Sequence, residues 1–211
     1  MKTVAIAPFL MLCIGLSVKS VYPIPPLLKA AETKTLSATT LKTDFTLSII
    51  WILKDTTENK KGSFTLKKPN MYRVELGDAI FVNDGKTVSR YSPGLKQLVI
   101  QDSKALGGDF QPGEWLFRYS DRFTSTNGIK ENINGTACES FSLTPKEKDR
   151  FKKIDVSVSL ADSMPRKIRT VDRNDNEATY MLNGIVLNSK IADKTFKFKP
   201  PKGTETIDMR E

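Results

Sequence analysis

The stretch DFTLSIIWIL, residues 44–53, decides the fold class of this chain of 211 residues. Every odd position from 45 to 53 holds a large apolar side chain, whereas the even positions are polar until Ile50. Side chains of a β-strand point alternately to opposite faces. This period of two therefore predicts a long strand with one strongly apolar face.

Shorter stretches of similar pattern follow along the chain, separated by turn residues. Asn83-Asp84-Gly85 stands between two of them and is a strong hairpin signal. Regular short strands joined by tight polar turns predict an α+β fold that is mainly antiparallel β. We expect these strands at residues 62–68, 71–76, 79–82, 87–91, 97–101, 139–143, 154–160, 166–172, 177–183 and 195–198.

Two segments interrupt the strand pattern. Leu27, Leu28, Ala31 and Leu36 recur at helical spacing, which predicts an amphipathic helix near the N-terminus. Residues 102–123 contain a glycine pair and an aromatic-rich run, which we interpret as short helices beside a flexible point.

The first twenty residues have the pattern of a secretory signal peptide. Lys2 precedes an apolar run of about fifteen residues, and small residues stand before a cut after Ser20. The run is shorter than the roughly 20 residues of a membrane-spanning helix, although an uncleaved anchor remains the alternative. Anchoring through Cys13 is disfavoured because Leu12 precedes it. We therefore predict an exported, periplasmic protein whose residues 21–211 form a single domain.

The composition argues against several function classes. Removing residues 1–20 leaves a net charge of about +7, but the lysines are dispersed and no nucleic-acid motif accompanies them. The chain has no histidine, and Cys138 is the one cysteine after the signal peptide. Neither G-x-S-x-G nor S-x-x-K occurs. We expect no enzyme activity, cofactor or metal, although an unrecognised carboxylate pair would still permit hydrolysis of lipids or glycans.

Several motifs occur in an order that resembles one protein family. They are Lys67-Lys68-Pro69-Asn70, Asp84-Gly85-Lys86-Thr87, Tyr91-Ser92-Pro93, Phe141-Ser142-Leu143-Thr144-Pro145-Lys146, and the segment from Lys194 to Gly203. Their order and spacing resemble the LolA family of periplasmic carriers, which move lipoproteins from the inner to the outer membrane. The resemblance spans about residues 27–208.

The resemblance implies an incomplete, half-open β-barrel, covered by a helical lid and enclosing an apolar cavity for acyl chains. The family's arginine before the proline, which ties the sheet to the lid, is Lys68 here, and lysine cannot make the same planar bidentate contact. The expected cavity-lining residues are Phe45, Leu47, Ile49, Trp51, Phe64, Leu66, Tyr72, Val74, Leu76, Trp115, Leu116 and Phe117.

The function that the resemblance implies is binding of an acylated lipoprotein or lipid and its transfer across the periplasm. The implied partners are an inner-membrane lipoprotein-releasing transporter and an outer-membrane acceptor lipoprotein, and we expect a monomer. The alternative is a lipid- or lipoprotein-sensing regulator of a membrane-bound anti-sigma factor. Such regulators usually have a second C-terminal domain, and this sequence stops soon after its last expected strand.

Overall fold

The computed structural model describes residues 24–104 and 118–210 of the chain. The expected signal peptide, the glycine pair at 107–108, and Trp115, Leu116 and Phe117 lie outside these residues. One α-helix is described, α1 (Pro26–Ser37), at the place that the sequence predicts. It begins with proline in its first turn, where the missing N–H costs no hydrogen bond.

The rest of the described chain is dominated by β-strands. They are β1 (Thr40–Trp51), β2 (Thr56–Lys67), β3 (Met71–Leu76), β4 (Ala79–Asn83), β5 (Thr87–Ser92), β6 (Gln97–Asp102), β7 (Phe123–Ser125), β8 (Ile129–Ile133), β9 (Thr136–Pro145), β10 (Phe151–Ser159), β11 (Pro165–Asp172), β12 (Glu177–Leu187) and β13 (Glu205–Asp208). Short 3-10 helices connect some of them: η1 (Ile52–Lys54), η2 (Pro93–Leu95) and η4 (Asp193–Phe196).

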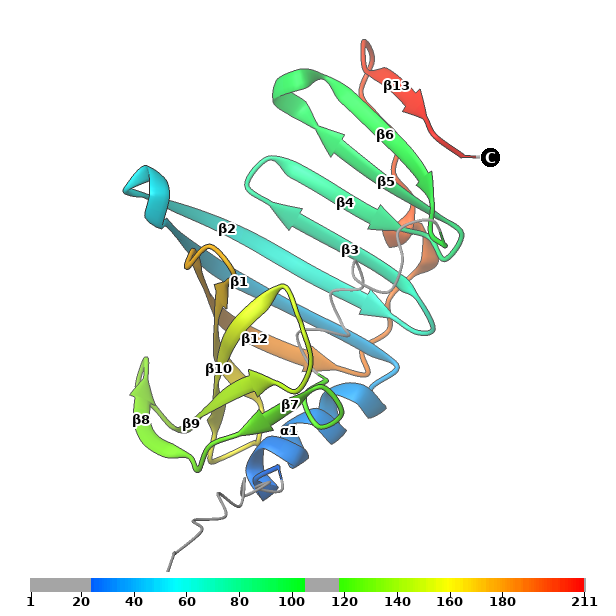
Figure 1. Ribbon diagram of the computed structural model, residues 1–211. Coiled ribbons are helices and arrows are strands. Elements are labelled where there is room, and N and C mark those ends of the chain that lie inside the picture. The colour runs from blue at the N-terminus through cyan, green and yellow to red at the C-terminus, as the bar shows by residue number, and fades with distance from the viewer. Residues whose placement is uncertain (1–23, 105–117, 211) are drawn as a thin grey trace, which may run out of the picture.

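In the described residues these strands form one curled sheet (Figure 1). Its order is β13-β6-β5-β4-β3-β2-β1-β12-β11-β10-β9-β7, and β8 pairs with β9 beside β7. Neighbouring strands are antiparallel except for β13, which pairs in parallel with β6. The end strands β7 and β13 do not meet, so the barrel is incomplete. The predicted fold class, mainly antiparallel β in an unclosed sheet, is confirmed.

The sheet has two faces that bury apolar side chains separately. The inner face is the one that bears Phe45, Phe64 and Tyr72, and α1 packs against it through Leu28 and Ala31. These residues belong to the large core, which also contains the inward side chains of β9 and β10. Register places Phe81 of β4 and Val88 of β5 on this inner face as well, whereas Val82, Tyr91 and Leu98 of β4, β5 and β6 lie on the opposite, outer face.

The outer face of β3–β6 is covered by η4 and the residues that follow it. Val82, Tyr91 and Leu98 are buried there together with Phe196. The ring of Phe198 packs on Tyr91 with 5.1 Å between the ring centroids. This second core closes the outer side of that half of the sheet without using any inner-face side chain.

The sequence prediction was wrong about residues 195–198, which do not form a strand. Residues 193–196 form the 3-10 helix η4, in which the Thr195 N–H donates to the Ala192 carbonyl at 3.0 Å. Phe196 and Phe198 alternate with lysines because both rings cover the outer core, and that pattern also fits a strand. The first strand also ends earlier than predicted, at Trp51, and Leu53 is 88% exposed in the turn that follows.

Three strands and half of a fourth were not predicted. β7 and β8 are short and pair with β9, and β13 has four exposed residues and pairs with β6 through its backbone. Residues 56–61 of β2 are polar on both faces and are strand because they pair with β1 in a long hairpin.

Candidate functional site

The predicted cavity-lining residues of β1, β2 and β3 lie on one face of the sheet. Odd positions of β1 share the inner face with even positions of β2, since Phe45 stands opposite Gly62 and Thr43 opposite Phe64. Phe64 in turn stands opposite Val74, and Leu66 opposite Tyr72. Register therefore brings together Phe45, Leu47, Ile49, Trp51, Phe64, Leu66, Tyr72, Val74 and Leu76.

Burial is not uniform across this inner face. Phe45, Leu47, Phe64 and Tyr72 are each less than a tenth exposed and belong to the main core. Ile49, Trp51, Leu66, Val74 and Leu76 are only partly buried. Part of the inner face is therefore used for self-packing, and part keeps apolar surface in contact with solvent.

A pocket of about 520 Å³ opens at the end of the sheet where β1 turns into β2. This volume lies within the range of roughly 300–1,000 Å³ that is typical of ligand sites. Its walls come from the ends of β1, β10, β11 and β12, and they are Ile49, Trp51, Arg150, Phe151, Thr170, Asp172, Arg173, Asn174, Asn176, Glu177, Ala178 and Tyr180.

Two of the predicted lining residues, Ile49 and Trp51, contribute to this pocket. Phe151 and Tyr180 were not predicted. Tyr180 stands opposite Leu47 across the β1–β12 pair, so it shares the inner face. The alternation of β12 is interrupted by Met181, an apolar residue on the opposite face from Tyr180. The sequence alone therefore did not show that Tyr180 belongs to the inner face.

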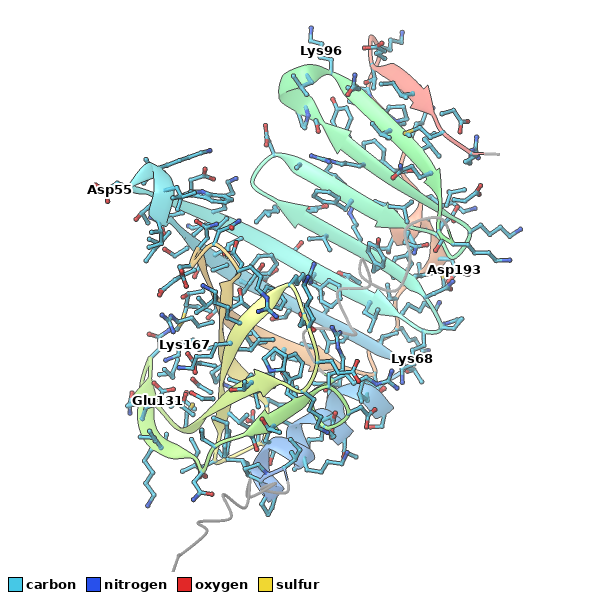
Figure 2. All side chains as sticks on the ribbon, in the orientation of Figure 1. Asp55, Lys68, Lys96, Glu131, Lys167 and Asp193 are labelled. Carbon is cyan, nitrogen blue, oxygen red and sulfur yellow. The ribbon has the colours of Figure 1, made fainter. Side chains whose placement is uncertain are left out.

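The opposite end of the β1–β2 pair is fastened to α1. Figure 2 shows Asp55 at the tip of the hairpin and Lys68 at the other end of β2, beside α1. The ammonium group of Lys68 donates a hydrogen bond to the carbonyl of Leu36 in the last turn of the helix. Cations near a helix C-terminus are stabilised by the unpaired carbonyls and the helix dipole. Lysine at this position therefore contacts the helix through one donor.

A second contact holds α1 one turn before Leu36, through the buried carboxylate of Glu32. Glu32 is 2% exposed and accepts N–H bonds from Tyr119 at 2.8 Å and Ser120 at 3.0 Å. Its second oxygen accepts from Lys29 at 2.8 Å and from the Ser120 hydroxyl. Burial by itself raises the pKa of Glu32, but these hydrogen bonds outweigh it and lower the pKa from 4.5 to about 2. Glu32 therefore remains ionised in the folded protein at neutral pH.

Sequence reasoning missed Glu32, although its spacing contained a signal. Leu28, Glu32 and Thr35 follow one another at intervals of four and three residues, which places them on one stripe of the helix. An acid on a buried stripe requires partners, and sequence alone did not identify them.

The hydroxyl of Tyr72 is a buried polar group on the inner face. Among the described residues it has no hydrogen-bond partner. Asn83 lies opposite Tyr72, but its amide donates to Ser103 at 3.0 Å and its oxygen accepts from the N–H of Gly85 at 2.8 Å. Burial raises the pKa of Tyr72 to about 12, so the phenol stays protonated.

The motif residues contact one another in space. The amide of Asn70, in the turn after β2, donates to the carbonyl of Gly85, in the β4–β5 hairpin, at 3.0 Å. Lys67 donates to the carbonyl of Ile191 at 3.0 Å and forms an ion pair with Asp193 of η4. The motifs therefore fasten the turns at one end of the sheet and attach the segment that covers the outer core.

Two observations limit the chemistry of the described part of the chain. No group of three His, Cys, Asp or Glu side chains converges there in a way that could hold a metal ion. Within the same residues, no helix has the combined length and apolar character needed to cross a bilayer.

These features define the class of incomplete antiparallel barrels with an apolar inner face and a helix packed on it. A family model described as outer membrane lipoprotein carrier protein LolA matches residues 37–199. The chain belongs to this family, and the resemblance predicted from the motifs is confirmed.

Named relatives agree with this assignment, and one solved structure shares the fold. The outer-membrane lipoprotein carrier protein of Pasteurella multocida (strain Pm70) is 27% identical over 154 residues, covering 71% of each protein. That of Actinobacillus succinogenes is 24% identical over 185 residues, covering 85% of each. An uncharacterized conserved protein from Thermus thermophilus has the same fold, with a TM-score of 0.56, 14% identity, and coverage of 86% of this chain and 96% of that one.

Proposed function

We propose that this chain is a periplasmic carrier that binds the acyl chains of lipoproteins on its apolar inner face. In this proposal it receives a lipoprotein from an inner-membrane releasing transporter and delivers it to an outer-membrane acceptor lipoprotein. It works as a monomer, without a cofactor and without catalysis. Its N-terminal twenty residues direct export and are removed near Ser20.

The observation that supports this proposal most strongly is the uneven burial of the inner face. A filled core would bury Ile49, Trp51, Leu66, Val74 and Leu76 as thoroughly as it buries their neighbours. These five side chains instead keep apolar surface accessible, and two of them, Ile49 and Trp51, line a pocket. Family membership supports the lipoprotein as cargo, since relatives with this fold are named outer-membrane lipoprotein carriers.

The energetics favour a site of this kind. An acyl chain of sixteen carbons exposed to water costs on the order of 12 kcal/mol, at about 0.8 kcal/mol per methylene. Partly exposed apolar side chains on a sheet reduce this cost by covering the chain, while leaving the ligand able to depart. In the proposal, α1 and the residues between β6 and β7 act as the movable cover, and Lys68 acts as the latch. Trp115, Leu116 and Phe117 would contribute to the cover.

The experiment uses protein purified from the periplasm, extraction of bound lipid, and mass spectrometry. The variant Val74→Asp places a charge on the half-buried inner face and should abolish co-purified lipoprotein or acylated lipid. The matched control is Ile129→Asp, which adds the same charge at a side chain that is 73% exposed on β8. Thermal melting of both variants shows whether each one is folded.

Several outcomes would contradict the proposal. Wild-type protein that never retains or accepts an acylated ligand would exclude a carrier of acyl chains. Equal ligand retention by Val74→Asp and Ile129→Asp would place the ligand away from the inner face. A pulldown that retrieves an anti-sigma factor, and no lipoprotein-releasing transporter, would favour a regulator over a carrier.

A further inference from the structure

The pocket at the hairpin end of the sheet has one apolar side and one cationic side. Ile49, Trp51, Ala178 and Tyr180 form the apolar side from β1 and β12. Ile49 stands opposite Ala178, which continues the inner face to the edge of the pocket. Burial raises the pKa of Tyr180, so its ring remains neutral and apolar in character within this wall.

Two arginines form the cationic side, at the start of β10 and in the turn after β11. The guanidinium of Arg150 lies 4.6 Å from the ring centroid of Phe151, a cation–π geometry that holds it beside the pocket. The positive charge of Arg150 also opposes the rise in the pKa of Tyr180, so it acts at the apolar wall. Arg173 donates from its Nε to the backbone carbonyl of Asp149 at 2.8 Å. Among the described residues, the two terminal nitrogens of Arg173 have no hydrogen-bond acceptor.

The acids of the pocket wall already have donors. The carboxylate of Asp172 accepts the N–H groups of Asn174 and Asn176 at 2.8 and 2.9 Å, and the Asn176 amide at 2.9 Å. Glu177 is held by Arg169, whose Nε lies 3.0 Å from it. The carboxylate of Asp149, which adjoins Arg173, forms an ion pair with Arg122.

Arg173 therefore lines the pocket with N–H groups that no described acceptor uses, and Arg150 lies beside it on the ring of Phe151. The two acids of the wall are already held, Glu177 by Arg169 and Asp172 by N–H donors. A guanidinium binds carboxylate and phosphate through paired N–H groups, and such charge-assisted bonds are roughly twice as strong as neutral ones.

We infer that this pocket binds the anionic headgroup of an acyl amphiphile, with a phosphate or carboxylate against Arg150 and Arg173 and the chain along Ile49, Trp51 and Tyr180. The inference rests on the proposed function, because the chain occupies the same inner face. It adds a preference that the apolar face alone does not supply. The ligand class is an anionic lipid with at least one acyl chain.

Isothermal titration calorimetry of lipid-free protein tests this inference. Dodecyl phosphate, dodecanoate and monolauroylglycerol share the length of their acyl or alkyl chain and differ in headgroup charge. We expect both anions to bind at least about tenfold more tightly than the neutral ester. Inorganic phosphate alone should not compete at similar concentrations, since it lacks the chain.

The double variant Arg150→Gln/Arg173→Gln should bring the anions to within about twofold of the neutral ester and leave the affinity for the ester unchanged. The control Lys96→Gln/Arg210→Gln removes the same charge near β6 and β13 and should keep the preference. Thermal melting of both double variants shows that each one folds.

The outcomes separate this inference from the proposed function. If none of the three amphiphiles binds, acyl binding itself fails. If all bind equally to the wild type, acyl binding stands and the headgroup site is wrong. A preference for anions that survives in Arg150→Gln/Arg173→Gln places the headgroup elsewhere. Competition by inorganic phosphate at similar concentrations would make the pocket a site for free anions and overturn the inference.

Discussion

Removing the carboxylate of Glu32 should destabilise the protein in a way that depends on pH. In the folded state, hydrogen bonds from Lys29, Tyr119 and Ser120 outweigh burial and hold its pKa at about 2, below the ordinary value of 4.5. A depressed pKa stabilises the folded state above the unfolded pKa, and this stabilisation is lost as the pH falls from 4.5 toward 2.

The magnitude follows from the pKa difference. At about 1.36 kcal/mol for each pKa unit, the ionised Glu32 contributes at most about 3 kcal/mol at pH 7. At pH 3 roughly 1.4 kcal/mol of this contribution remains, because part of the folded population and most of the unfolded population is protonated. Partial exposure of Lys29 at the helix surface reduces both figures, so we expect about 2 kcal/mol at pH 7 for Glu32→Gln.

Urea denaturation followed by circular dichroism at pH 7 and pH 3 measures this effect. The control Glu147→Gln lies at an exposed position between β9 and β10. Glu32→Gln should lower the free energy of unfolding more than Glu147→Gln at pH 7, and the gap should shrink by more than half at pH 3. An equal loss at both pH values would show that shape, and not charge, stabilises the contact, and no loss would refute the role of the carboxylate.

Three further substitutions have expected outcomes that differ in sign or size. Gly62→Ala should lower the free energy of unfolding by at least about 2 kcal/mol, because the Cβ of the new alanine would lie 2.5 Å from Phe45 Cζ. Thermal melting measures this loss, and the control is Gly94→Ala, whose Cβ would have no neighbour within 4 Å. Tyr72→Phe should raise that free energy by about 1 kcal/mol in urea denaturation, since its buried hydroxyl is unpaired among the described residues; a decrease would reveal a hidden partner. Lys68→Met should lower the free energy of unfolding by about 0.5–1 kcal/mol, because the hydrogen bond to α1 is lost, whereas Lys68→Arg should retain that bond. Equal urea midpoints for the two variants would contradict the contact.

Much of the fold could be predicted because most strands that face a core have an alternating pattern. The strong alternation of β1 placed Phe45, Leu47 and Ile49 on one face, and the register confirms that they share it. The Asn83-Asp84-Gly85 hairpin was predicted from its turn chemistry and joins β4 to β5. A strand with one buried face and one solvent-exposed face shows alternating apolar and polar residues in its sequence.

Elements that are held in the sheet by backbone pairing alone have no such alternating pattern. β13 has no buried side chain, and residues 56–61 of β2 are polar throughout, so only their neighbours in the sheet define them as strands. The pocket could not be predicted from the sequence either. It forms only because the fold brings Trp51 beside Phe151 and Tyr180, which are about 100 residues or more further along the chain. Alternation predicts which way a side chain faces and not how much space lies in front of it.

The division of the apolar residues between two cores explains how the inner face can remain partly open in a stable protein. The outer core of Val82, Tyr91, Leu98 and Phe196 closes one half of the sheet by itself. The Lys68 attachment to α1 lies at one end of the inner face, whereas the pocket lies at the other end of β1, about 30 Å away at 3.3 Å per residue. The outer core is separate from the core that contains the α1 residues, so a change in how α1 sits on the sheet leaves the outer core in place. In the proposed carrier, such a separation would let the inner face exchange a ligand for self-contacts at the cost of the helix attachments and of the core contacts of Leu28 and Ala31.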